Sequence, residues 1–202
     1  MLFQGQEFGA SSPFLYFVDA SGELAEAIRK GRFKFLAQFP SLATEEMQRQ
    51  LPNPSDPGTF ARCKLNFLER KTNQQHYDLH CDLIQLRRND SRFSEPRQGG
   101  VDGAVLGNSA FLLRFFGPNC DDRLLIVNLA EALPLVAPAE PLLAPPDGFQ
   151  WETLWSSESP RYGGLGTAQT ASDERWMLPA EAAVALYPVR RTSPRKKPVR
   201  RQ

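Results

Sequence analysis

The sequence predicts an α+β protein in which a helical half, residues 1–91, precedes an all-β half, residues 101–188. Three observations carry this prediction. Apolar residues recur at helical spacing in the first half. Beyond Asp90, short apolar runs alternate with Gly, Pro and Asn turn signals. Between the halves, RFSEPRQGG at residues 92–100 has the composition of a linker.

The chain begins with an apolar run, MLFQG at residues 1–5, which is typical of a buried strand in a parallel sheet. Such a strand needs neighbours on both sides, yet helical patterns follow it. Either the strand pairs with a segment far downstream, or its partner strands are missing from this chain. We favour missing partners.

The helical half has a recognisable order. An aromatic-rich loop, residues 11–20, leads to Ser21, which is a suitable N-cap for a helix over residues 22–39 that Pro40 ends. A short helix is expected at residues 45–50, a proline-rich stretch without regular helix at 51–59, and a helical turn at 60–64. The clearest helix is expected at residues 73–89, where leucines share one face.

The all-β half contains short strand-like runs separated by Gly and Pro turns, a pattern that favours an antiparallel β-sandwich. The expected strands are residues 101–106, 110–116, 123–129, 149–156 and 182–187.

The charge of the chain is uneven. Residues 190–202 hold seven of the 24 basic residues and no acidic one, which leaves a body with 17 basic and 23 acidic residues. We expect residues 189–202 to form a disordered basic tail, a solvated extension rather than a nucleic-acid-binding arm. No apolar run approaches the roughly 20 residues of a membrane helix, and no secretory signal is evident. The three widely spaced cysteines suit reduced thiols, so we expect a cytoplasmic protein.

The sequence contains no complete version of the common zinc-binding or serine-hydrolase motifs. His76 and His80 are four residues apart, as in zinc-binding helices, but Tyr77 stands where that motif has glutamate and no third ligand has a recognisable spacing. We therefore expect no metal and no cofactor in this chain. No Gly-x-Ser-x-Gly elbow occurs, so a serine hydrolase is not indicated.

The loop after the first strand carries the residue types of a sugar site. Glu7, Asp19 and Glu23 supply carboxylates, and Phe14, Tyr16 and Phe17 supply rings that can stack on a sugar. The alternative is that Glu7 anchors the loop and the aromatic residues belong to the core.

Several segments resemble the C-terminal part of malto-oligosyltrehalose trehalohydrolases, which belong to the α-amylase superfamily. The resemblance extends to about Pro188 and leaves only the basic tail outside it. It is carried by LFQGQEFG at residues 2–9, SPFLYFVD at 12–19, GRFKFLAQF at 31–39, DPGTFARCKLNF at 56–67, VDGAVLGNSAFLLRFFG at 101–117, DRLLIVNLA at 122–130 and LLAPPDGFQWETLWSSESPRYGG at 142–164.

This resemblance implies that residues 1–91 are a C-terminal remnant of a (β/α)8 barrel, namely its last strand and outer helices, and that residues 101–188 are the C-terminal sandwich domain. The family hydrolyses maltooligosyl trehalose to release trehalose, with retention, using an Asp nucleophile, a Glu acid/base and a further Asp. All three lie on earlier barrel strands, so none has a counterpart here. By location only, Glu7, Phe14, Tyr16 and Asp19 are the expected substrate-binding residues. Many amylase-type relatives have Glu-Glu where this chain has Gln6-Glu7, which puts a charge role at position 6 in doubt.

Two functions follow as hypotheses. The first is a C-terminal fragment of such a hydrolase, inactive alone, which acts on an α-glucan or maltooligosyl trehalose only if the missing barrel is supplied, for example by a companion N-terminal chain. The second is a non-catalytic α-glucan-binding or accessory protein. For the second, Trp151, Trp155 and Trp176 are candidates for sugar stacking, although tryptophans in a sandwich usually belong to the core.

Overall fold

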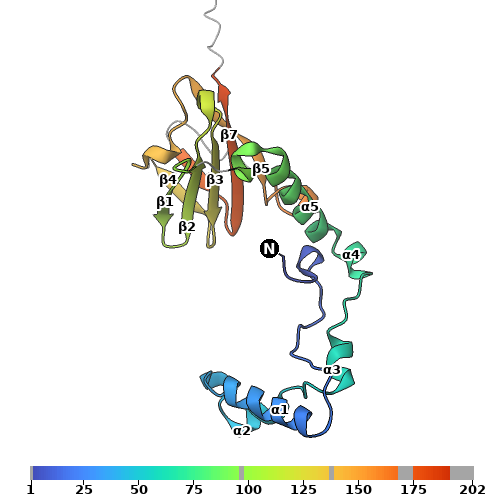
Figure 1. The fold of residues 1–202 in the computed structure, drawn as a ribbon. Helices are drawn as coiled ribbons and strands as arrows, with labels where there is room; N and C mark the ends of the chain where they lie inside the picture. The colour runs from blue at the N-terminus through green and yellow to red at the C-terminus, as the bar shows by residue number, and fades with distance from the viewer. Residues whose placement is uncertain (1, 96–97, 137–138, 168–174, 192–202) are drawn as a thin grey trace, which may run out of the picture. The chain divides into compact units, whose positions relative to one another are not determined.

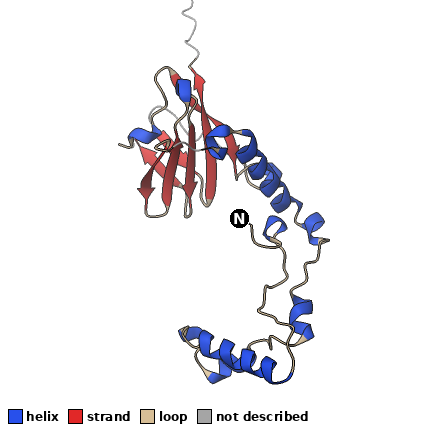
Figure 2. Cartoon of the chain, viewed as in Figure 1, coloured by secondary structure: helices blue, strands red, loops and turns tan. Residues whose placement is uncertain are grey.

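A computed structural model of the chain describes residues 2–95, 98–136, 139–167 and 175–191. The chain divides into two compact units, Met1–Tyr77 and Asp78–Gln202. The described part of the first unit is helical, and the described strands all belong to the second (Figures 1 and 2). The predicted α+β composition is thus present, with the helices first.

The first unit consists of short helices joined by loops. They are η1 (Gln6–Phe8), α1 (Gly22–Leu36), η2 (Pro40–Leu42), α2 (Glu45–Gln50), α3 (Pro57–Arg62), α4 (Glu69–Thr72) and the first residues of α5 (Gln74–Asn89). The helices predicted at residues 45–50 and 73–89 are confirmed. For α2, the Thr44 hydroxyl accepts the Met47 N–H at 3.4 Å and so caps the helix.

The strand predicted at residues 1–5 is not formed at residues 2–5. The Gln6 N–H donates to the Phe3 carbonyl at 3.1 Å, and Gly5, at φ 77°, lets the chain turn into η1. Leu2 and Phe3 remain exposed. The physical reason is that a parallel strand takes its backbone hydrogen bonds from neighbouring strands, and the described part of the first unit contains none.

Prolines shift two other predicted helix limits. The first helix ends at Leu36 rather than at residue 39, because the residue before Pro40 is pushed out of the helical region and Phe39 is extended. Pro57, predicted to lie outside regular helix, instead begins α3, where its missing N–H costs nothing and Asp56 accepts the Gly58 N–H at 2.8 Å.

The second unit is built on a five-stranded antiparallel sheet in the order β1-β2-β3-β7-β5. Its strands are β1 (Val101–Gly107), β2 (Ala110–Phe115), β3 (Arg123–Asn128), β5 (Phe149–Ser156) and β7 (Ala182–Arg190). All five predicted strands are therefore present in an antiparallel sheet. The last one is longer than predicted and runs to Arg190, into the segment predicted as tail; residues 192–202 lie outside the described part of the chain.

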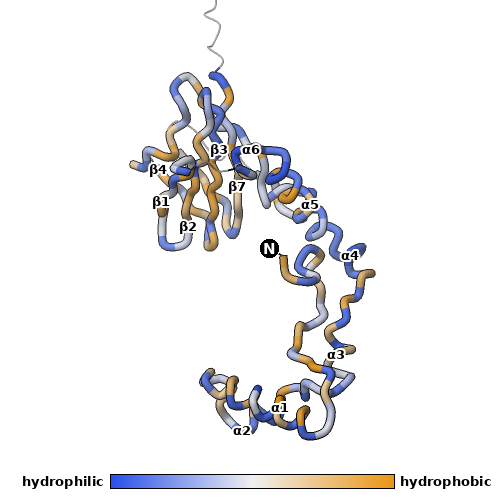
Figure 3. The backbone as a smooth tube through the Cα atoms, viewed as in Figure 1, coloured by the Kyte–Doolittle hydropathy of each residue, from blue (hydrophilic) through white to orange (hydrophobic). Residues whose placement is uncertain are grey.

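One face of this sheet forms the core. Alternation along β2 and β3 brings every second residue to that face, and Figure 3 shows the hydrophobic residues along these two strands. Cross-strand neighbours such as Leu112 and Ile126, or Leu124 and Leu186, are buried together. The described core cluster contains Ala110, Leu112, Leu124, Ile126, Leu143, Trp151, Trp176, Leu178, Val184 and Leu186.

A second, two-stranded sheet shares this core, and sequence analysis missed both of its strands. β4 (Leu133–Val136) pairs with β6 (Arg175–Leu178), and β6 contributes Trp176 and Leu178 to the core cluster. Each strand has four residues, and Pro134 interrupts the strand pattern of β4, so neither gives a clear alternation.

The opposite face of the large sheet receives the end of α5 and a short helix, α6 (Ser91–Ser94). This helix lies partly within the segment predicted as a linker, and the Asp90 carboxylate caps it by accepting the Arg92 N–H at 3.0 Å. Phe93 packs edge-on against Phe115 of β2, with ring centroids 5.0 Å apart.

Candidate functional site

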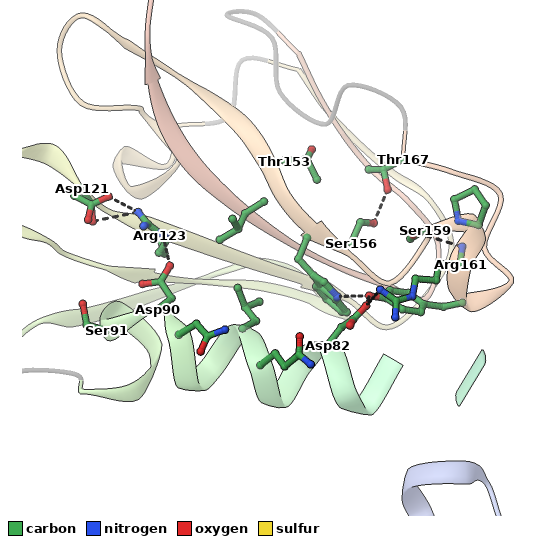
Figure 4. Close-up of a pocket in the computed structure, with 17 residues that line it drawn as sticks. Asp82, Asp90, Ser91, Asp121, Arg123, Thr153, Ser156, Ser159, Arg161 and Thr167 are labelled. Atoms are coloured by element: carbon green, nitrogen blue, oxygen red, sulfur yellow. Dashed lines mark hydrogen bonds and ion pairs between the residues drawn. The ribbon is translucent and has the colours of Figure 1, made fainter. Parts of the chain in front are cut away.

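A pocket in the second unit lies between the C-terminal part of α5 and strand β5 (Figure 4). It has a volume of about 920 Å³, within the range of small-molecule sites. The described residues that line it are Asp82, Gln85, Leu86, Asn89, Asp90, Ser91, Asp121, Arg123, Thr153, Leu154, Trp155, Ser156, Ser159, Pro160, Arg161, Tyr162 and Thr167.

Asp82 organises one end of the pocket. Its Oδ2 accepts the Tyr162 hydroxyl at 2.6 Å and the Arg161 Nη1–H at 2.7 Å (Figure 4). The Trp155 indole Nε1–H donates to the same Tyr162 hydroxyl at 3.2 Å, and the two rings lie 6.2 Å apart. Burial, followed by the hydrogen bond to the neighbouring Asp82 carboxylate, raises the pKa of Tyr162.

The segment after β5 holds Arg161 and Tyr162 in place through a tight turn. A 3-10 helix, η5 (Pro160–Tyr162), is capped by Ser159, and Gly163 leaves it at φ 88°. Gly164 passes so close to the Glu158 backbone that a Cβ would lie 2.3 Å from its carbonyl carbon, so only glycine fits. The glycine-rich sequence therefore serves a close backbone approach beside the pocket.

Arg123 organises the other end of the pocket. Its Nε–H donates to Asp90 and its Nη1–H to Asp121, each at 2.6 Å (Figure 4). The Arg123 and Asp90 side chains are nearly buried, so this pair fixes the end of α5 against β3. Arg92 reaches Asp121 at 3.6 Å and extends the network to α6.

Sequence reasoning missed most of this pocket. It named Trp155 as a candidate for sugar stacking but did not connect it with Asp82, Arg161 and Tyr162. Asp82 and Tyr162 are 80 positions apart, and no local motif links them. The only usable signal was an aromatic pair, Trp155 and Tyr162, beside a glycine-rich turn.

The other two tryptophans belong to the core, as the alternative interpretation held. Trp151 is 7% exposed and Trp176 is 6% exposed. The Trp151 indole Nε1–H donates to the Leu143 carbonyl at 2.8 Å, which satisfies it inside the core. The hypothesis that Trp151 or Trp176 stacks on a sugar is therefore wrong. Trp155, by contrast, is only half-buried.

The four residues predicted to bind substrate lie in the first unit and have different surroundings. Glu7 is in η1 and half-buried. Phe14 is 56% exposed, and its ring packs edge-on against Phe3 at 5.1 Å. Tyr16 lies under the Arg32 guanidinium at 5.0 Å, and Asp19 lines a second pocket, of about 440 Å³.

This loop is anchored by hydrogen bonds with two later residues, Glu69 and Asn73, rather than by Glu7. The Ser11 N–H and hydroxyl donate to the Glu69 carboxylate at 2.8 and 2.6 Å, which lowers the pKa of Glu69. The Asn73 amide donates to the Phe8 carbonyl at 2.9 Å. The loop is held while Phe14, Tyr16 and Phe17 stay exposed, so these rings are not core residues within the described first unit.

Three further features bear on the function classes considered. Within the described ranges, no group of three or more His, Cys, Asp or Glu side chains is arranged to hold a metal ion. Cys63, Cys81 and Cys120 are all free thiols. No helix in the described part of the chain is long and apolar enough to span a membrane.

The chain is similar to known proteins over parts of its length. Residues 98–185 match the family model described as a domain of unknown function, DUF3459. The chain is 39% identical over 112 residues to the malto-oligosyltrehalose trehalohydrolase of Deinococcus radiodurans, a match that covers 52% of this chain and 18% of the relative. With the enzyme of the same name from Brevibacterium helvolum it shares 31% identity over 135 residues, covering 65% and 21% of the two chains. The chain therefore spans about a fifth of the length of these relatives.

Solved structures show the same fold. The chain superposes on the trehalose-6-phosphate hydrolase of Bacillus licheniformis with a TM-score of 0.52 at 14% identity, over 93% of this chain and 35% of that one. An inactive double mutant of MutB in complex with isomaltulose gives a TM-score of 0.54 at 18% identity, with the same coverage. The predicted resemblance to a C-terminal portion of malto-oligosyltrehalose trehalohydrolases is confirmed.

Proposed function

We propose that this chain is the C-terminal portion of a cytoplasmic glycoside hydrolase of the malto-oligosyltrehalose trehalohydrolase type. In this proposal its second unit is the β-sandwich that follows a (β/α)8 barrel, and its first unit completes that barrel. The assembled protein hydrolyses maltooligosyl trehalose and releases trehalose. The observation that carries the proposal is the 31% to 41% identity to relatives of that name over 91 to 135 residues.

The surface of the first unit supports this assignment. Its longest helix within the unit, α1, buries none of its residues, and Leu24 and Phe35 on it are exposed. Phe3, Phe14, Phe17 and Phe60 form a chain of edge-on ring contacts that is also largely exposed. A contiguous apolar surface of this kind marks an interface. In the proposal, the remaining barrel covers it.

The proposal leaves catalysis to residues outside this chain. A retaining mechanism needs a nucleophile and an acid/base whose carboxyl groups lie about 5 Å apart on opposite sides of the scissile bond. In the family these come from earlier barrel strands. Glu7, Phe14, Tyr16 and Asp19 act only as substrate contacts at the edge of the barrel site, and the chain alone is inactive.

Trehalose release from maltooligosyl trehalose tests the proposal directly. The purified chain is assayed alone and after co-expression with the barrel portion of the Deinococcus radiodurans relative. We expect no trehalose from the chain alone and release from the co-expressed pair above the level of the barrel portion by itself. Trehalose release by the chain alone would contradict the proposal, and so would a barrel portion that gains nothing from the chain.

A second candidate function, non-catalytic α-glucan binding, is favoured by Trp155. This side chain is half-buried at a pocket, whereas the other two tryptophans are in the core. Saturable maltodextrin binding by the chain alone tests this function, and no binding at millimolar sugar would remove it.

A further inference from the structure

We propose that the pocket between α5 and β5 is a binding site for one glucose unit of an α-glucan, with Trp155 and Tyr162 as its apolar wall and Asp82 as its main hydrogen-bond acceptor. The inference rests on the second candidate function and gives it a location. It requires neither the barrel nor hydrolysis. All the lining residues belong to the second unit.

The charges of the pocket favour a neutral ligand. Among the described lining residues, every charged side chain is in an ion pair with another one: Asp82 with Arg161, and both Asp90 and Asp121 with Arg123. A charged ligand would have to compete with these pairs, because each is already satisfied at 2.6 or 2.7 Å. A neutral ligand binds without breaking them.

The polar groups favour a ligand with several hydroxyls. Ser156, Ser159 and Thr167 line the pocket beside Gln85 and Asn89. The Ser156 hydroxyl already accepts from Thr167 and from the Glu158 N–H, and the Ser159 hydroxyl accepts the Arg161 N–H, so a ligand would use the positions that these bonds leave. Hydroxyl and amide side chains both donate and accept hydrogen bonds, and so do sugar hydroxyls. The carboxylate of Asp82 adds acceptor capacity, since an ionised carboxylate offers about four lone-pair sites and two are used by Tyr162 and Arg161.

The aromatic pair supplies the apolar part of the site. The Trp155 and Tyr162 rings are inclined by 38°, and the indole N–H is already bonded to the Tyr162 hydroxyl. Both rings are therefore fixed in orientation before a ligand arrives, which reduces the entropy lost on binding. A pyranose ring has one face of C–H groups, and such a face packs on an aromatic ring while its hydroxyls reach the polar groups around it.

The test is titration of the full chain with maltotriose, followed by calorimetry and by the indole ¹⁵N–¹H spectrum. Three indole signals are expected, and those of the core residues Trp151 and Trp176 report whether a variant is folded. We expect saturable binding in the millimolar range, about 1 to 10 mM, with a shift confined to the Trp155 signal. Glycerol serves as a small polyol control.

Three variants give the site its location. Trp155→Ala should weaken maltotriose binding by about tenfold or more, and Tyr162→Phe, which keeps the ring and removes the hydroxyl, by about fivefold. The matched aromatic control is Phe67→Ala in the first unit, which removes an exposed ring that belongs to neither proposed binding site and should leave the affinity unchanged. If Trp155→Ala loses the core signals, Trp155→Phe replaces it, because it keeps a ring and removes the hydrogen bond to Tyr162.

Each result decides one question. Maltotriose binding that Trp155→Ala leaves unchanged would overturn the location but keep α-glucan binding. No saturable maltotriose response, or an equal response to glycerol, would overturn both. A response at Trp155 in a chain that never supports trehalose release would leave this site standing and remove the hydrolase proposal.

Discussion

Asp90 and Arg123 join the end of α5 to β3, the middle strand of the large sheet, through a hydrogen-bonded ion pair of 2.6 Å. Each side chain is 14% exposed, so the pair is shielded from solvent. Asp90 also caps α6, and Arg123 also holds Asp121. One carboxylate thus fixes both the helix and the pocket that lies along it.

We predict that Asp90→Ala lowers the free energy of unfolding of the second unit by about 3 kcal/mol, because it leaves the Arg123 charge partly unpaired and removes a helix cap. Urea unfolding followed by tryptophan fluorescence measures this. The matched control is Glu152→Ala on β5, whose carboxylate accepts only exposed hydrogen bonds and should cost less than about 0.5 kcal/mol. Equal losses for the two variants would contradict the role of Asp90.

Arg114 and Asp122 form a second pair, which is buried on the core side of the sheet. Arg114 Nη2–H donates to Asp122 at 2.7 Å and Nη1–H to the Ala144 carbonyl at 2.6 Å. We predict that Asp122→Ala costs about 3 to 5 kcal/mol, because it strands a buried guanidinium. The double variant Asp122→Ala with Arg114→Met should recover part of this loss. A cost that is simply additive would show that the pair is not coupled.

These two ion pairs show where sequence reasoning stopped. The five long strands could be predicted because alternation and turns are local signals, and two helices could be predicted because their caps and periodicity are local too. Arg114 occupies a core position of β2 that alternation assigns to an apolar residue. Its charge is accommodated there by Asp122 and by the carbonyls of Leu142 and Ala144. Tertiary packing determines which residues become the hydrogen-bond partners of a buried charge, and a single sequence does not reveal that packing.

The same reasoning applies to the candidate site and to the first residues of the chain. Trp155 could be named from its residue type, but it bonds to Tyr162, and Tyr162 in turn bonds to Asp82 on a helix 80 positions earlier. Tertiary packing alone brings these residues together. For residues 2–5, the apolar run predicts a buried strand correctly only if neighbouring strands exist to complete its hydrogen bonds. The residue pattern of a segment indicates which secondary structure it can form, and the neighbouring segments determine whether that structure forms.

Tyr162 makes the pocket sensitive to alkaline pH. Burial, then the Asp82 carboxylate, raise the pKa of its phenol above the ordinary value of 10.0. A raised folded-state pKa contributes stability that is fully present below the ordinary pKa and is lost as the pH rises through the folded-state pKa. We predict a late phenolate absorbance step that Tyr162→Phe removes and that Asp82→Asn moves to lower pH. A step unaffected by Asp82→Asn would show that the carboxylate has no part in the shift.

Limited proteolysis should separate the two units. The second unit has a core of buried apolar residues that its two sheets share. In the first unit, helix α1 buries none of its residues, and several aromatic residues of the unit are exposed. Proteases cleave where local unfolding costs little free energy, so we predict early cuts in residues 1–77 and a resistant product that retains residues 101–188. Mass spectrometry of the products identifies the boundary.

When the barrel portion of a relative is co-expressed, its surface should cover the exposed rings and slow the early cuts. A compact, resistant first unit in the chain alone would contradict the proposal that it completes a barrel supplied from elsewhere, because such a unit would need no partner.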